Sequence, residues 1–207
     1  VKQTKSELYR HLKSKAGTIY FNAQDETLKE LIGNYTHTQP YNLTKGIHGN
    51  ILQTLPTLNV EIHDPGQDQW LTLPTQLFGE YNMINILAAA AVGKHFGMDL
   101  NEIGRGIANY RPDNYRSQVI QLQGLTVILD CYNANPTSMR LALEDFSRLS
   151  HPRKIAILGE MKELGEYSAK EHENLVRQAE NSGFADTWLI GKAFKSLETG
   201  ACRHFND

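Results

Sequence analysis

The stretch LTVILDCYNANPTSMRLALEDF, residues 125–146, decides the fold class. It opens with a nearly continuous apolar run, Leu125–Asp130, which predicts a strand that pairs with Val119–Leu122 across a turn at Gln123-Gly124. Asn135 is a favoured N-cap residue, and Pro136 suits the first position of a helix. Apolar side chains then recur at helical spacing, at Met139, Ala142, Leu143, Phe146 and Leu149. The sequence therefore predicts a strand, a short polar turn and a helix.

The same alternation continues downstream. Further strands are predicted at Ile155–Leu158, Thr187–Ile190 and Cys202–Phe205. Ser168 and Glu171 have the spacing of a capping box and should open the helix between the first two of them. Strands that alternate with helices imply a parallel sheet with flanking helices. We expect residues 111–207 to form an α/β, Rossmann-like domain with a mostly parallel sheet.

Residues 1–110 have another pattern, and Arg111-Pro112-Asp113 breaks the chain after them. Pro65-Gly66 lies between two alternating runs and predicts a hairpin. Glu80–Phe96 is apolar on nearly all sides and should be a helix central to a core. Asp99 and Glu102 predict a capping box for the next helix. We place a domain boundary between residues 110 and 111.

Composition excludes several classes of protein. The 207 residues include 40% hydrophobic and 21% charged residues, and the formal net charge is −2. This balance favours neither nucleic acid nor an anionic membrane as a partner. The two cysteines, Cys131 and Cys202, lie far apart, which argues against a disulfide framework or a zinc site. No apolar run approaches the ~20 residues that span a bilayer. We expect a cytoplasmic protein.

Three groups of polar residues could bind a ligand. Asp130–Ser138 follows a strand and opens a helix, where a carboxylate can bind a ribose and free N–H groups an anion. Asn82 and Asn85 share a helix face and could pair with a purine. Arg116 could hold phosphate oxygens. Helix capping, a stray polar residue and a surface arginine are the respective alternatives, and position alone does not exclude them.

The loop Gly159–Gly165, GEMKELG, follows the strand at Ile155. Its charges and flanking glycines suit a mobile loop that faces a ligand. An ordinary connection from strand to helix explains it equally well. His172 in the next helix is more typical of a structural residue than of a catalytic one.

Taken together, five motifs resemble the Mur ligases. They are, in order, QTKSELY at Gln3, GEYNMINILAAAAVG at Gly79, RSQ at Arg116, ILDCYNANPTSM at Ile128 and ILGEMKELGEYS at Ile157. The resemblance implies that residues 1–110 are the C-terminal part of the central, ATP-binding domain. Residues 111–207 then resemble the family's C-terminal Rossmann-like domain. The last two motifs are specific to the members that add D-Ala-D-Ala to UDP-MurNAc-tripeptide.

The resemblance also implies roles for individual residues. Lys5 matches a catalytic lysine whose carbamate helps to hold Mg²⁺, a metal that prefers anionic oxygen ligands. The residues that match ATP contacts are Asn82, Asn85, Arg116, Asp130 and Tyr132. The residues expected near the substrate are Asn133, Asn135 and Ser138. Cys131 stands where the family usually has a serine, which puts any hydroxyl role there in doubt.

The implied reaction belongs to peptidoglycan precursor synthesis. ATP phosphorylates the terminal carboxylate of the UDP-MurNAc-tripeptide, and the amine of D-Ala-D-Ala attacks the acyl phosphate. The sequence contains neither the family's GTNGKT phosphate loop nor a UDP-binding domain, and it begins with Val1. We expect a fragment that is inactive alone. Alternatives are another Mur or folylpolyglutamate-type amide ligase, or a non-catalytic Rossmann-like binding module.

Overall fold

The computed structural model describes the backbone of residues 2–5 and all atoms of residues 6–197 and 199–205. The chain divides into two compact units, Val1–Arg111 and Pro112–Asp207. No helix among the described residues is long and apolar enough to cross a bilayer.

The first unit contains four helices and five strands among its described residues. The helices are α1 (Lys2–Ser14), α2 (Glu26–Ile32), α3 (Asn82–His95) and α4 (Leu100–Asn109). The strands are β1 (Ile19–Asn22), β2 (Thr38–Tyr41), β3 (His48–Gln53), β4 (Asn59–Asp64) and β5 (Gln69–Pro74). β1 and β2 form a parallel pair, whereas β3, β4 and β5 form an antiparallel sheet.

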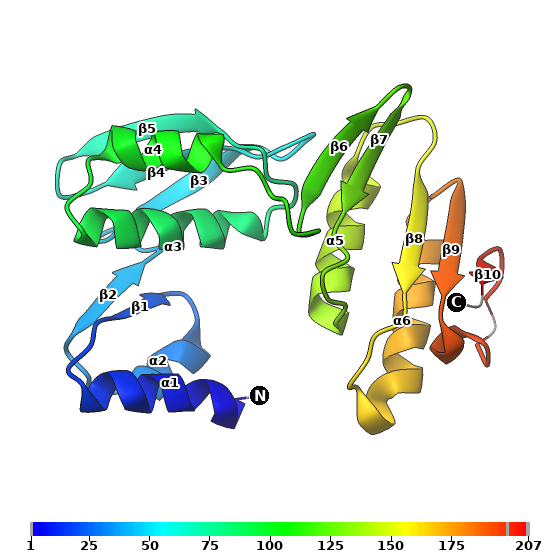
Figure 1. The fold of residues 1–207 in the computed structure, drawn as a ribbon, viewed down its shortest axis with the longest axis horizontal. Coiled ribbons are helices and arrows are strands. Elements are labelled where there is room, and N and C mark those ends of the chain that lie inside the picture. The colour runs from blue at the N-terminus through cyan, green and yellow to red at the C-terminus, as the bar shows by residue number, and fades with distance from the viewer. Residues whose placement is uncertain (1, 198, 206–207) are drawn as a thin grey trace. The chain divides into compact units, whose positions relative to one another are not determined.

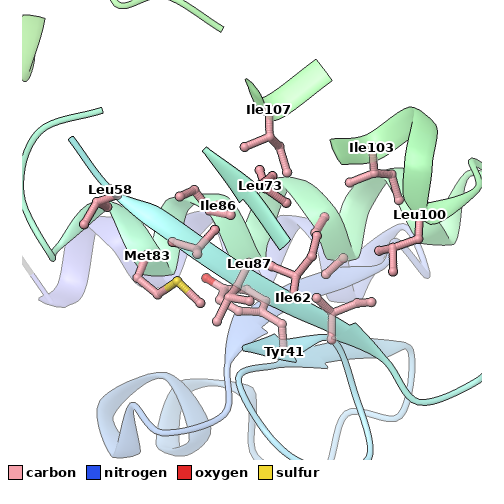
Figure 2. Close-up of a cluster of buried hydrophobic side chains, with 14 of the residues drawn as sticks. Tyr41, Leu58, Ile62, Leu73, Met83, Ile86, Leu87, Leu100, Ile103 and Ile107 are labelled. Atoms are coloured by element: carbon pink, nitrogen blue, oxygen red, sulfur yellow. The ribbon is translucent and has the colours of Figure 1, made fainter. Parts of the chain in front are cut away.

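Helix α3 is the centre of this unit. Figure 1 shows it between the β1–β2 pair and the layer that holds β3–β5 and α4. Its inner side chains, such as Ile86 and Leu87, pack with Ile62 of β4 and Ile103 of α4 in one apolar cluster (Figure 2). The prediction that this helix is central to a core is confirmed, although Asn85 on its outer side is exposed. Much of the helix's apolarity comes from alanine, whose small side chain can face water at little cost.

Local signals in the first unit are confirmed. Asp99 accepts a hydrogen bond from the Glu102 amide, and the Glu102 carboxylate accepts one from the Asp99 amide, so the capping box is complete. The Pro65-Gly66 turn joins β4 to β5 as a hairpin. These features depend on residues close in sequence, which is why the pattern predicted them.

The second unit contains five strands and two α-helices among its described residues. The strands are β6 (Gln118–Leu122), β7 (Leu125–Leu129), β8 (Ile155–Gly159), β9 (Asp186–Ile190) and β10 (Arg203–Phe205). The helices are α5 (Pro136–Arg148) and α6 (Ser168–Glu180), with short 3₁₀ turns η1 (Gly165–Tyr167) and η2 (Lys192–Phe194). β8, β9 and β10 form a parallel sheet in the order β10-β9-β8, which confirms the α/β class.

Helices α5 and α6 supply the core of this unit. Leu143 of α5 and Leu175 of α6 pack against Ala156, Leu158 and Leu189 of the parallel sheet. The predicted pairing of Val119–Leu122 with Leu125–Asp130 across the Gln123-Gly124 turn is confirmed, because β6 and β7 form an antiparallel hairpin. The expectation that the second of these strands also belongs to the parallel sheet is wrong within the described part, where β7 pairs only with β6.

The predicted capping box of α6 is also absent. The Ser168 side chain makes no cap hydrogen bond, and Tyr167 precedes the helix within the 3₁₀ turn η1. The turn already supplies backbone hydrogen bonds at the helix start, such as that from the Tyr167 amide to the Leu164 carbonyl oxygen. The Ser168 hydroxyl lies instead 3.3 Å from Nδ1 of His172.

Candidate functional site

The segment after β7 is bound to the segment before β6. The backbone amide of Ser117 donates to Oδ1 of Asp130 at 3.1 Å. The carbonyl oxygen of Tyr115 accepts two bonds, from the amides of Cys131 at 2.8 Å and Tyr132 at 3.2 Å. Three hydrogen bonds therefore fix Tyr115–Ser117 against the polar turn that follows the strand.

The two residues beside Arg116 have unusual backbone geometry. Tyr115 has φ 58° and Ser117 has φ 52°, in the left-handed region that favours glycine. Such a conformation costs about 1 kcal/mol or more per non-glycine residue and persists only where surrounding contacts impose it. Here those contacts are the bonds to Asp130, Cys131 and Tyr132.

The side chain of Arg116 lies on an aromatic ring. Its guanidinium carbon is 3.8 Å from the centroid of the Tyr132 ring, which is a cation–π contact. Tyr132 keeps 61% of its surface exposed, and Arg116 and Asp130 are exposed as well. The structure thus brings together three of the five residues predicted to contact ATP.

The three residues predicted to bind substrate form the start of α5. Asn135 is its N-cap, and its side-chain oxygen accepts from the Ser138 amide at 3.0 Å. The Ser138 hydroxyl donates to the Asn135 carbonyl oxygen at 3.2 Å, and Oδ1 of Asn133 accepts from the Ala134 amide. These bonds show that Asn135 caps the helix.

Asn82 and Asn85 lie in the first unit, at the start of α3. The Asn85 amide donates to Oδ1 of Asn82 at 2.9 Å, and the Asn82 amide donates to the Phe78 carbonyl oxygen at 2.8 Å. Asn82 is buried and Asn85 exposed. The two predicted adenine contacts are therefore linked, with Asn85 as the outer residue.

Residues 115–201 match the family model described as Mur ligase, glutamate ligase domain. A UDP-N-acetylmuramoyl-tripeptide–D-alanyl-D-alanine ligase of Treponema pallidum is 37% identical over 128 residues, 62% of this chain. The ligase of the same name from Mycobacterium tuberculosis is 30% identical over 218 aligned residues, 97% of this chain. The chain belongs to the Mur ligase family.

Solved Mur ligases have the same fold. The structure of MurF from Acinetobacter baumannii superposes with a TM-score of 0.82 at 26% identity, over 99% of this chain and 45% of that one. MurF from Thermotoga maritima, solved in complex with ADP, gives a TM-score of 0.76 at 18% identity over 92% of this chain and 44% of that one. This Mur ligase chain spans 27% and 42% of the two curated relatives' lengths.

The GEMKELG loop of this Mur ligase is fastened at its start. Oε2 of Glu160 accepts from the Ala193 amide at 3.1 Å, and the Met161 amide donates to Nε2 of the buried His172 at 2.9 Å. Lys162 and Glu163 remain exposed. The structural interpretation of His172 fits these bonds, and the exposed charges are left to face solvent or a ligand.

Lys5 lies within α1, but its side chain is outside the described part of the structure. Among the described residues, no group of three or more His, Cys, Asp and Glu side chains could hold a metal ion.

Two residues of the site were not predicted from the sequence. Tyr115 and Ser117 fix the position of Arg116 through their backbones. Neither is glycine or asparagine, the residue types that most often signal a positive φ. No local pattern could have found them, because the partners that impose the conformation come from the far side of the β6–β7 hairpin.

Proposed function

We propose that this chain is part of an ATP-dependent ligase that joins D-Ala-D-Ala to UDP-MurNAc-tripeptide through a new amide bond. The observation that carries the proposal is the cluster of Arg116, Asp130 and Tyr132 at the YNANPTSM turn. Its support is the 30% identity, along 97% of the chain, to a relative named for that reaction. The relative's name supplies the substrate class, and the cluster supplies groups suited to a nucleotide.

Arg116 and Asp130 have complementary roles in this proposal. The guanidinium of Arg116 offers donors in a planar fork, which matches phosphate oxygens. The exposed carboxylate of Asp130 accepts hydrogen bonds from ribose hydroxyls, because ionised carboxylate oxygens are hydrogen-bond acceptors and this group is open to solvent. The ring of Tyr132, which lies against the Arg116 guanidinium, is the third member of this part of the proposed ATP-binding site.

Asn82 and Asn85 are proposed to recognise adenine. Asn85 uses one amide hydrogen on Asn82, so its second hydrogen and its oxygen can pair with a purine edge. Asn82 uses its own amide on Phe78 and therefore orients Asn85. In the proposal, Asn85 is the direct contact and Asn82 supports it.

The turn that opens α5 is proposed to lie near the incoming dipeptide. The side-chain oxygen of Asn135 and the hydroxyl of Ser138 are used in the helix cap. The amide NH₂ groups of Asn133 and Asn135 are donors that these bonds do not use, and they suit a carboxylate. The cap thus fixes the turn while those amides bind substrate.

The reaction proceeds in two steps in this proposal. The terminal carboxylate of the tripeptide takes the γ-phosphoryl group of ATP, and ADP leaves. The dipeptide amine then attacks the acyl carbon, and phosphate leaves as the amide forms. Arg116 offsets charge on the phosphoryl oxygens, and binding aligns the reacting groups.

We also propose that Lys5, as its carbamate, binds Mg²⁺, which would stabilise charge on the phosphates. A cytoplasmic location follows from the proposed substrates, since ATP and UDP-linked precursors are intracellular metabolites.

The test is a ligation assay on the full-length product of the gene that encodes this chain. With ATP, Mg²⁺, UDP-MurNAc-tripeptide and D-Ala-D-Ala, we expect the pentapeptide product and stoichiometric ADP. Arg116→Gln should lower kcat/KM roughly 100-fold. Arg153→Gln, which changes another exposed arginine, should leave it within about twofold. Preference for a single amino acid over the dipeptide would overturn the proposal.

A further inference from the structure

Arg116 is held by an aromatic ring and not by an acid. Its guanidinium carbon lies 3.8 Å from the Tyr132 ring centroid, and within the described part of the chain no carboxylate forms an ion pair with it. A ring face attracts a cation through its quadrupole and uses none of its in-plane hydrogen-bond donors. A carboxylate would occupy those donors. The ring thus leaves the N–H edge of Arg116 available for an anion.

The backbone of Arg116 is fixed from both sides. Tyr115 accepts two bonds from Cys131 and Tyr132, and Ser117 donates to Asp130. Both neighbours of Arg116 have positive φ, a conformation that these bonds impose. The backbone at Arg116 is therefore fixed next to Tyr132, and the guanidinium group at the end of the Arg116 side chain lies on the ring of that same residue.

We propose that Tyr132 is a positioning residue that acts on the nucleotide only through Arg116. By keeping the guanidinium over its ring, it restricts the rotamers of a flexible side chain and presents the N–H edge to phosphate oxygens. The inference rests on the proposed function, in which Arg116 binds the ATP phosphates. It replaces the expectation that Tyr132 contacts the nucleotide directly.

The competing interpretation is that Tyr132 stacks on adenine. One face of the ring is already covered by Arg116 at 3.8 Å, so that face is not available to a base. Stacking would require a purine. Positioning of Arg116 would act on any polyphosphate, with or without a base. This difference separates the two interpretations.

The first experiment is NMR on the 207-residue chain. The Arg116 side-chain resonances should show an upfield ring-current shift, which Tyr132→Phe retains and Tyr132→Leu abolishes. Tyr167→Leu removes another exposed tyrosine of the same unit and should leave Arg116 unchanged. Loss of the contact does not threaten folding, because Tyr132 is exposed. If the chemical shifts of the Arg116 side chain are unchanged in Tyr132→Leu, the proposal is wrong.

The second experiment is a double-mutant cycle on the full-length gene product, with ATP and then tripolyphosphate as probes. Tyr132→Leu should weaken binding of both probes roughly three- to tenfold, and Tyr132→Phe should restore most of it. In an Arg116→Gln background, Tyr132→Leu should have no further effect.

The outcomes separate this inference from the proposed function. If Tyr132→Leu weakens ATP but not tripolyphosphate, or still acts in the Arg116→Gln background, Tyr132 contacts the nucleotide itself and the inference is wrong. If Arg116→Gln leaves both probes bound as before, the proposed role of Arg116 fails, whatever the NMR result.

Discussion

The backbone amide of Met161 donates a hydrogen bond of 2.9 Å to Nε2 of His172, a side chain with no solvent exposure. Nδ1 of the same ring bonds to the carbonyl oxygen of Ser168 at 2.7 Å. Because Nε2 accepts, the proton is on Nδ1, which donates, so the ring is the neutral tautomer. The rings of Phe194 and His172 pack in a T-shaped arrangement, with centroids 4.9 Å apart. His172 therefore joins the GEMKELG loop to α6.

We predict that His172→Leu destabilises the second unit by about 2 kcal/mol, because it leaves the Met161 amide buried without an acceptor. His172→Gln should cost less, since its side-chain oxygen can accept the same bond. Urea unfolding followed by Trp188 fluorescence in a Trp70→Phe background measures this, as Trp188 lies in the second unit. If the two variants lose the same free energy of unfolding, the hydrogen bond from the Met161 amide is not the reason that His172 stabilises the unit.

An ion pair between a buried carboxylate and a partly exposed lysine stabilises the first unit. Oδ2 of Asp64 lies 2.5 Å from Nζ of Lys94, and the Asp64 side chain is 3% exposed. Lys94→Met should destabilise this unit by about 3 kcal/mol, because it leaves a buried carboxylate without its cation. Lys29→Met removes an exposed pair with Glu26 and should cost below ~0.5 kcal/mol. Urea unfolding followed at Trp70 in a Trp188→Phe background provides the measurement.

The two cysteines should differ in reactivity. Burial, and next the negative charge of Glu180, raise the pKa of the Cys202 thiol, whereas Cys131 is exposed. Because a raised pKa delays formation of the reactive thiolate as pH rises, alkylation of Cys202 should increase only above the ordinary titration range of cysteine. Peptide mapping after iodoacetamide treatment at pH 8 should find Cys131 modified first. Faster labelling of Cys202 would contradict this.

The proposed carbamate can be observed directly. With ¹³C-bicarbonate, the chain should give a carbamate carbonyl signal that disappears in Lys5→Arg, because a guanidinium does not form this adduct under the same conditions. Lys2→Arg changes another lysine of α1 and should leave the signal intact. A signal that survives Lys5→Arg would place the modification elsewhere.

Features that depend on nearby residues could be predicted. The Asp99–Glu102 capping box and the Asn135 cap close within one helical turn, so a spacing of three residues is enough to identify them. The polarity pattern likewise located β8 and β9. The capping box predicted from Ser168 and Glu171 is absent because the 3₁₀ turn that precedes α6 competes for the same backbone groups.

The stretch of residues 125–146 by itself determined a strand, a polar turn and a capped helix. The Gln123-Gly124 turn also predicted the hairpin of β6 and β7, whereas only the tertiary structure decided that β7 lies outside the parallel sheet. That pairing brings Tyr115 and Ser117 against Asp130 and Cys131, and it places Arg116 on Tyr132. The physical reason is the separation along the sequence. Helix caps and polarity patterns involve residues within a few positions of one another. The contacts around Arg116 join residues 13 to 16 positions apart, which come together only because β6 pairs with β7.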